Sequence, residues 1–176
     1  MDSKEIRLIK ISDNTEIASC IRKVFKEHNI DRPGTAYFDT CLDHMFEHHQ
    51  KEKSAYYVAF SEGKLAGGAG IFPTEGLPED TCELVKMYLL KDARGRGIGK
   101  ALMEQCIFCA EKNGFKKIYL ETLPELNTAI GMYEKFGFHT VSDDQMPKYF
   151  KRIKNLFDVA VLFRKTEENL LVMKLE

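Results

Sequence analysis

The sequence predicts an α/β fold of the α+β kind, in which a mixed central sheet of about six to seven strands is flanked by four or more helices. Three observations support this prediction. Two neighbouring β-rich runs have the spacing of an antiparallel hairpin, a long apolar strand leads into a helix and a further strand, and helical periodicity appears before and after these runs. The length of 176 residues predicts a single domain over residues 1–176.

The first part of the chain is predicted to form a strand and two helices. Residues 5–10 alternate apolar and charged side chains, which is the period of a strand. Asp13-Asn14-Thr15-Glu16 has the order of a capping box and predicts the start of a helix, and the turn residues 31–34 end that helix. A second helix is predicted over residues 36–50.

The next segments are predicted to form the centre of the sheet. Residues 54–60 and 64–72 are apolar and rich in β-forming residues, and Ser61-Glu62-Gly63 joins them as a hairpin turn. Residues 81–90 follow as a long, mostly buried strand that leads directly into a cluster of glycines.

A crossover and a short closing unit are predicted to follow. A helix extends from the glycine cluster to a C-terminal cap at Gly114, and residues 117–122 form the next strand. Residues 126–136 form a short helix that Gly137 ends, and residues 138–142 return as a strand.

Composition and charge exclude several classes of protein. The 26 basic and 27 acidic residues nearly cancel, so no overall charge attracts nucleic acid. No apolar run approaches the length needed to cross a membrane, and the charged N-terminus lacks the apolar region of a secretory signal. The five cysteines are odd in number and scattered, which argues against a disulfide framework. We therefore expect a cytoplasmic protein with reduced thiols.

The glycine cluster Arg94-Gly95-Arg96-Gly97-Ile98-Gly99-Lys100 is the main candidate binding site. Glycines between a strand and a helix let the backbone approach a ligand closely, and the first amides of the helix then point at an anion such as a diphosphate. The alternative is that these glycines only form a tight turn. A Walker loop is disfavoured because Ala101 replaces the hydroxyl residue, and the glycine spacing does not fit a dinucleotide fingerprint.

Two motifs of the chain resemble those of the GNAT superfamily of acetyl-CoA-dependent N-acetyltransferases. The superfamily's signature Gln/Arg-x-x-Gly-x-Gly/Ala is matched by Arg94, Gly97 and Gly99. Its later segment Ala-x-x-x-Tyr-x-x-x-Gly-Phe is matched by Ala129, Tyr133, Gly137 and Phe138. The predicted order of elements over residues 4–142 is also similar to that of the superfamily, so the resemblance implies a GNAT-like fold.

The resemblance implies that the chain transfers an acetyl group from acetyl-CoA to an amine of a small molecule or peptide. It further implies that main-chain groups hold the cofactor. The pyrophosphate would bind the amides of Arg94, Gly95, Arg96, Gly97, Ile98, Gly99 and Lys100, and the pantetheine arm would pair with the backbone of Met87, Tyr88 and Leu89. The Lys100 side chain could add a cation near the phosphates, or it could simply be a solvated lysine.

Two catalytic residues follow from the same resemblance. Tyr133 stands where many members carry a tyrosine that protonates the departing thiolate, although it could instead be a core aromatic. Glu83 stands where some members carry the glutamate that accepts the proton of the amine, directly or through water, although it could be a strand-edge carboxylate paired with Lys86. Many members carry an asparagine at the position of Leu126, so Asn127 is only a weak candidate for a cofactor contact.

The C-terminal segment 147–165 departs from the superfamily. It contains six basic residues and a single acidic one, and its apolar spacing favours a helix before a closing strand at 170–175, with a hairpin as the alternative. A helix packed on its own sheet is the preferred interpretation. The other interpretations that stay open are a cover for the acceptor cleft, a homodimer contact and an anionic surface.

The acceptor is only weakly indicated. Tyr37, Phe38 and Asp39 are candidates for the acceptor cleft, and Asp39, Asp43 and Glu47 hint at a cationic acceptor. No metal is predicted, because the His44 and His48 pair lacks an evident third ligand. Two other classes remain as alternatives, a non-catalytic acyl-CoA-binding module and a nucleotide-binding α/β domain.

Overall fold

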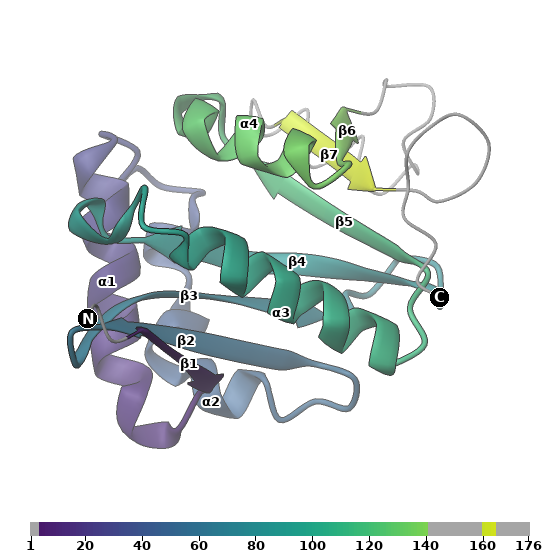
Figure 1. The fold of residues 1–176 in the computed structure, drawn as a ribbon, viewed down its shortest axis with the longest axis horizontal. Coiled ribbons are helices and arrows are strands. Elements are labelled where there is room, and N and C mark those ends of the chain that lie inside the picture. The colour runs from purple at the N-terminus through teal and green to yellow at the C-terminus, as the bar shows by residue number, and fades with distance from the viewer. Residues whose placement is uncertain (1–3, 141–159, 165–176) are drawn as a thin grey trace. The chain divides into compact units, whose positions relative to one another are not determined.

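The structure, a computed structural model, describes residues 4–140 and 160–164 (Figure 1). The chain divides into two compact units. The first unit contains the residues up to Phe72 together with Leu84–Cys109, and the second contains Pro73–Glu83 and the residues from Ala110 onward. The single domain expected over residues 1–176 stays a prediction.

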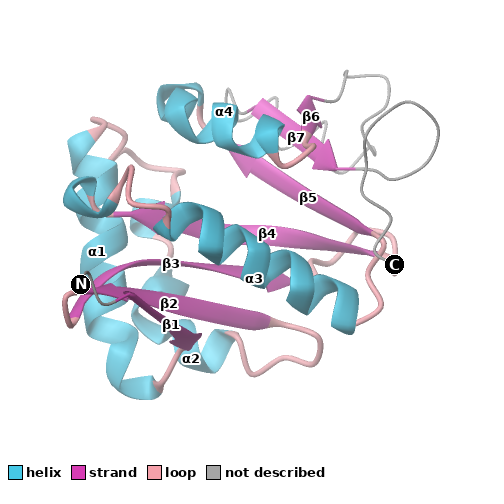
Figure 2. Ribbon diagram, viewed as in Figure 1, coloured by secondary structure: helices cyan, strands magenta, loops and turns pink. Residues whose placement is uncertain are grey.

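The first unit contains the N-terminal half of the predicted sheet, in the strand order β1-β2-β3-β4 (Figure 2). The strands are β1 (Lys4–Leu8), β2 (Ala55–Ser61), β3 (Lys64–Phe72) and, from Leu84 onward, β4 (Thr81–Leu89). β2 pairs antiparallel with both β1 and β3. The predicted hairpin is confirmed: Glu62 and Gly63 form its turn with φ values of 52° and 75°, the left-handed pair that suits a two-residue hairpin.

Helices cover both faces of this part of the sheet. They are α1 (Asn14–Glu27), α2 (Met45–His48) and α3 (Ile98–Lys112), with short 3-10 turns at Ile11–Asp13, Ala36–Phe38, Thr40–His44 and Lys91–Ala93. Figure 1 shows α3 in front of β2 and β3, with α2 behind. Successive side chains of a strand point to opposite faces of the sheet, and Tyr56 and Tyr57 of β2 do so. The ring centroid of Tyr56 lies 5.1 Å from that of His49, which follows α2, whereas Tyr57 lies against Cys109 of α3.

The continuous helix predicted over residues 36–50 is wrong, because the segment is broken into two 3-10 turns and the short α2. Asp39 interrupts it with extended backbone (φ −68°, ψ 117°). The carboxylate of Asp39 accepts a hydrogen bond from the Cys41 amide at 3.0 Å. It also forms an ion pair with the Lys86 ammonium at 2.6 Å. A short acidic side chain that bonds nearby backbone competes with helix formation, and here a tertiary contact stabilises the break.

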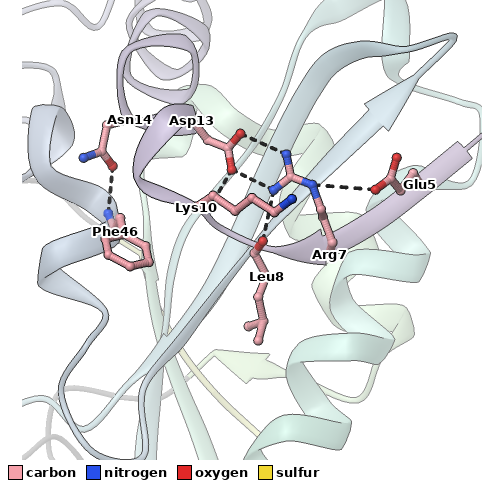
Figure 3. Close-up of polar contacts among 7 residues, drawn as sticks. All are labelled: Glu5, Arg7, Leu8, Lys10, Asp13, Asn14 and Phe46. Atoms are coloured by element: carbon pink, nitrogen blue, oxygen red, sulfur yellow. Dashed lines mark hydrogen bonds and ion pairs between the residues drawn. The ribbon is translucent and has the colours of Figure 1, made fainter.

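The predicted first helix is confirmed as α1, but its capping box is not formed. Asp13 precedes the helix without a side-chain cap; its carboxylate instead accepts hydrogen bonds from the Arg7 guanidinium at 2.7 and 2.9 Å and from the Lys10 amide at 2.7 Å (Figure 3). Asn14 accepts a hydrogen bond from the Phe46 amide at 2.8 Å. These contacts join β1 to the starts of α1 and α2.

The second unit contains the predicted crossover strand and the short closing helix. Its elements are β5 (Lys117–Thr122), a 3-10 turn at Pro124–Leu126, α4 (Asn127–Lys135), β6 (His139–Thr140) and β7 (Ala160–Arg164). The strand order is β4-β5-β7-β6, and β5 runs parallel to the first residues of β4 with Thr81–Glu83 opposite Lys117–Tyr119. The predicted strand 117–122 has the observed bounds.

The helix predicted in the basic segment is wrong for residues 160–164. These residues form β7, which pairs antiparallel with β5 and with β6. Pairing with the backbone of β5 and β6 outweighs a helical apolar spacing, so these positions form a strand, while the hairpin with residues 170–175 stays a prediction. Residues 147–159 and the closing strand predicted at 170–175 lie outside the described residues.

Candidate functional site

The glycine cluster forms a loop that opens into the first turn of α3. Residues 94–97 form a turn and α3 begins at Ile98. Gly95 and Gly97 have φ values of 71° and 79°, which non-glycine residues rarely adopt, and a Cβ built on either one would meet no atom within 4 Å. The loop therefore borders open space on these faces. The first amides of a helix lack partners within the helix, so this loop fits an anion.

The Arg94 side chain joins the loop to α1. Its guanidinium donates two parallel hydrogen bonds to the Glu27 carboxylate at 2.7 and 2.8 Å, and its Nε donates to the Leu89 carbonyl at 3.0 Å. The hydrogen bonds from Arg94 lower the pKa of Glu27 below its usual value. Because three donors of Arg94 are used within the protein, its side chain fixes the shape of the loop more than it offers charge to a ligand.

The other two cations of the loop also have partners. Arg96 forms an ion pair with Glu62 of the hairpin turn at 2.9 Å, and Lys4 donates to the Arg96 carbonyl at 2.6 Å. Lys100 is exposed, and its Nζ lies 3.6 Å from Oε1 of Glu104, one turn along α3. This contact is a weak surface ion pair. The main-chain amides thus stay the better candidates for an anion, and their role stays a prediction.

The end of β4 presents backbone groups at one edge. The Leu90 amide donates to the Ala66 carbonyl of β3 at 2.9 Å, and the Tyr88 carbonyl lies directly against Gly67. Alternate residues of a strand direct their backbone polar groups to opposite edges, so those of Met87 and Leu89 are directed away from β3. On that side the Leu89 carbonyl accepts the hydrogen bond from Arg94 Nε. This end of β4 is suited to pair with an extended, amide-containing ligand.

The second unit contains Glu83, the predicted proton acceptor. Its carboxylate accepts a hydrogen bond from the Thr74 hydroxyl at 2.5 Å. Glu83 stands opposite Tyr119 in the register of β4 and β5, so both side chains lie on one face of the sheet. The sequence indicated pairing with Lys86 as an alternative for Glu83; Lys86 instead pairs with Asp39.

Glu121 is a candidate that the sequence analysis missed. It lies two residues after Tyr119 on β5, on the same face as Glu83, and accepts a hydrogen bond from the Tyr119 hydroxyl. Burial raises the pKa of Glu121 above its usual value, although the Tyr119 bond opposes the shift. The sequence signal for Glu121 was an acidic residue inside a strand-forming run. In the structure Glu121 is half-buried between the buried residues Leu120 and Thr122, and a half-buried acid in a core strand often has a functional role.

Tyr133 lies on α4 in the second unit. It is 5% exposed, and its ring centroid lies 5.9 Å from that of Phe138. The Phe138 amide donates to the Tyr133 carbonyl at 3.1 Å, beyond the turn at Gly137, which has a φ of 81°. The motif segment therefore folds back on itself. The ring packs as a core aromatic would, and the role of the hydroxyl stays a prediction.

The three acidic residues behind the predicted cationic acceptor each have a partner within the protein, and the acceptor itself stays a prediction. Asp39 pairs with Lys86, which together with the Cys41 amide lowers its pKa against the opposing effect of burial. Asp43 forms a bidentate pair with Arg22, and Glu47 accepts a hydrogen bond from Asn14 at 2.7 Å. Asp39 and Asp43 are thus paired with cations of the protein, whereas the partner of Glu47 is an uncharged amide.

Neither a metal centre nor a membrane span is seen in the described part of the chain. Over residues 4–140 and 160–164, no three histidine, cysteine or acidic side chains gather at a position that would hold a metal ion. No helix among the same residues is both long and apolar enough to cross a bilayer. His48 of the proposed histidine pair stacks on Phe72 with ring centroids 4.5 Å apart.

Comparison with known proteins identifies the class that this fold and loop define. The profile of the Acetyltransferase (GNAT) family matches residues 21–138, and the chain belongs to this family. It is an acetyl-CoA-dependent N-acetyltransferase with a GNAT-like fold, as the resemblance implied.

Individual relatives agree with this assignment. The chain is 38% identical over 140 residues to the uncharacterized N-acetyltransferase YjgM of Escherichia coli, covering 79% of this chain and 84% of that protein. It is 30% identical over 114 residues to human N-acetyltransferase 8B, covering 61% of this chain and 50% of that protein.

Solved structures share the fold at low sequence identity. An acetyltransferase of the GNAT family from Staphylococcus aureus superposes with a TM-score of 0.79 at 20% identity, covering 94% of this chain and 100% of that one. The PaiA N-acetyltransferase of Thermoplasma acidophilum, solved in complex with coenzyme A, gives a TM-score of 0.67 at 17% identity, covering 93% of this chain and 99% of that one.

Proposed function

We propose that the protein transfers the acetyl group of acetyl-CoA directly to a primary amine of a small molecule or peptide, without a covalent acyl-enzyme. The observation that carries this proposal is the open loop of residues 94–100, whose arginines are held by carboxylates while its glycines leave the backbone accessible. In this proposal the loop amides bind the pyrophosphate. The backbone of Met87, Tyr88 and Leu89 binds the pantetheine arm in the manner of an added strand.

The chemistry needs a proton acceptor and a proton donor. An alkylammonium, with a pKa of about 10, must lose a proton before its nitrogen can attack the thioester carbon. Glu83 takes this proton, directly or through water. As the carbon–sulfur bond breaks, the Tyr133 hydroxyl donates a proton to the departing thiolate. The nitrogen that has formed the new bond to the acetyl carbon then loses its second proton, which restores the Tyr133 hydroxyl directly or through water. The products are an acetamide and coenzyme A, and Glu83 releases the first proton to solvent.

The experiment that tests this proposal measures thiol release from acetyl-CoA against a panel of primary amines, including polyamines, amino sugars and peptides. We expect release that depends on the presence of one class of amine. Binding of acetyl-CoA with no amine-dependent release from any member of the panel would instead indicate a non-catalytic acyl-CoA-binding module. Preference for NAD or ATP over coenzyme A in a thermal-shift assay would contradict the proposal altogether.

The Arg94–Glu27 pair gives a prediction about cofactor affinity. Glu27→Gln removes the charge that holds Arg94, so the loop is less well ordered before the cofactor arrives. We expect acetyl-CoA to bind roughly 10-fold more weakly, a change of about 1.4 kcal/mol, measured by calorimetry. The phospho-ADP half of coenzyme A should be weakened by the same factor, because the loop binds that half.

Asp43→Asn is the matched control for this prediction. It breaks a second bidentate arginine–carboxylate pair, Arg22–Asp43, in the same unit but away from the loop. Acetyl-CoA affinity should then stay within about 2-fold of the parent, a difference of only ~0.4 kcal/mol. Equal losses in the two variants would show that Glu27 has no specific role in shaping the loop.

The pH profile decides between the two carboxylates on the shared sheet face. Glu83→Gln cannot accept a proton, so we expect kcat/KM to fall about 100-fold and the acidic limb of its pH profile to disappear. Glu121→Gln is the comparison. If the acidic limb survives in Glu83→Gln and is lost in Glu121→Gln, then the proton acceptor is Glu121.

The position of that limb is also informative. Activity that requires an ionised carboxylate falls as the pH drops through its pKa. Because burial raises the pKa of Glu121, a limb that depends on Glu121 lies at a higher pH than an ordinary glutamate would give.

A further inference from the structure

The backbone of β4 is interrupted just before the residues assigned to the pantetheine arm. Lys86 has a φ of 49°, in the left-handed region, while the residues on either side continue the strand. A left-handed residue inside a strand is typical of a β-bulge, which shifts the alternation of backbone groups by one residue. We call this position the Lys86 bulge. It determines which of residues 87–89 direct their amides and carbonyls away from β3.

The bulge is costly for a lysine and needs external support. A non-glycine residue in the left-handed region costs on the order of 1 kcal/mol or more, and persists where its surroundings hold it. Two contacts hold Lys86. The Tyr56 hydroxyl donates to its carbonyl at 2.8 Å, and its ammonium pairs with Asp39 at 2.6 Å. The backbone and the side chain of the bulge residue are thus each fixed from another element.

Tyr56 reaches the bulge across an intervening strand. Tyr56 lies on β2 and Lys86 on β4, with β3 between them. Tyr56 stands opposite Gly70 in the register, and a Cβ on Gly70 would come within 2.6 Å of its ring. A Cβ on Gly68 would come within 2.8 Å of its hydroxyl oxygen. Because these two glycines have no side chains, the Tyr56 ring has room to lie across β3.

We infer that Tyr56 is a positioning residue for acetyl-CoA: by holding the Lys86 carbonyl across Gly68 and Gly70, it sets the bulge that directs the backbone of Met87–Leu89 toward the pantetheine arm. Asp39 supports the same bulge through the Lys86 side chain. Tyr56 is fully buried, and burial raises its pKa far above the usual value, so the hydroxyl stays protonated as a permanent donor. This inference rests on the proposed assignment of the pantetheine arm to Met87–Leu89.

The test compares Tyr56→Phe with Tyr57→Phe. Both variants lose one phenol hydroxyl from the same strand, but Tyr57 faces α3 on the opposite side of the sheet. We expect Tyr56→Phe to weaken acetyl-CoA binding about 10-fold, with a matching rise in KM and little change in kcat. Binding of the phospho-ADP half of coenzyme A should not change, because that half does not touch β4 in the proposed mode.

Asp39→Asn provides a second variant should Tyr56→Phe fold poorly. Asp39 is half-buried, and asparagine at this position removes the ion pair with Lys86 while its side-chain oxygen can still accept the hydrogen bond of the Cys41 amide. A selective loss of acetyl-CoA affinity in either variant, with phospho-ADP affinity retained, supports the inference. Unchanged acetyl-CoA affinity in both, or equal losses in Tyr56→Phe and Tyr57→Phe, would overturn it and leave the proposed function intact. Failure of the parent protein to bind acetyl-CoA would instead refute the proposed function.

Discussion

Tyr133→Phe should lower kcat by about 10²- to 10⁴-fold while the KM for acetyl-CoA changes little. The hydroxyl is proposed to protonate the thiolate as it departs, a contribution made only in the transition state. The phenyl ring would keep the packing against Phe138, whose ring centroid lies 5.9 Å away. The measurement is steady-state thiol release at saturating amine.

The stability of the variant separates this role from that of a core aromatic. Losing one buried hydroxyl costs about 1 to 2 kcal/mol of unfolding free energy at most, so the folded enzyme should persist. Tyr57→Phe is the control, because it removes a buried phenol hydroxyl from the other unit. If Tyr133→Phe retained kcat within a factor of about 3 of the parent, Tyr133 would be only a core residue.

Gly67→Ala should cause the largest loss of stability among single methyl additions to the sheet. Gly67 has a φ of 153°, and a Cβ there would collide with the Tyr88 carbonyl oxygen and come within 2.8 Å of the Leu89 side chain. These neighbours include backbone atoms of β4, which cannot move without displacing the strand. We expect the unfolding free energy to fall by more than about 3 kcal/mol in urea titration.

Gly63→Ala is the matched control for Gly67→Ala. Gly63 also has a left-handed φ, of 75°, but a Cβ there would meet no atom within 4 Å. The unfolding free energy of Gly63→Ala should therefore fall only by the cost of placing alanine in the left-handed region, about 1 to 2 kcal/mol. A loss in Gly67→Ala no larger than that in Gly63→Ala would show that β4 can move away from β3 freely.

Locally determined elements were predicted well. β3 has the predicted bounds, and the helices α3 and α4 are followed by glycines with φ values of 80° and 81°. The hairpin turn at Glu62 and Gly63 also forms as predicted. Each of these features depends on residue type and spacing within a few positions, because strand period and glycine geometry act over that range.

The errors occurred where distant contacts override local preference. Residues 36–50 have helical spacing, but Asp39 is held out of the helix by Lys86, a residue 47 positions away. Residues 160–164 also fit a helical stripe, yet they pair with β5. Neither partner could be identified from the local pattern.

The sequence by itself predicted the loop, and its resemblance to the GNAT superfamily implied the acetyl donor. The glycines between a long strand and a helix predicted the loop, because glycine freedom and helix-terminal amides are properties of short segments. The match of Arg94, Gly97 and Gly99 to the superfamily's signature then implied the family and the cofactor. Only the tertiary structure decided which side chains hold the loop and β4. It pairs Arg94 with Glu27, 67 residues away, and Tyr56 with the Lys86 carbonyl, 30 residues away. Side chains separated by that much sequence meet only when packing of the sheet and helices brings them together.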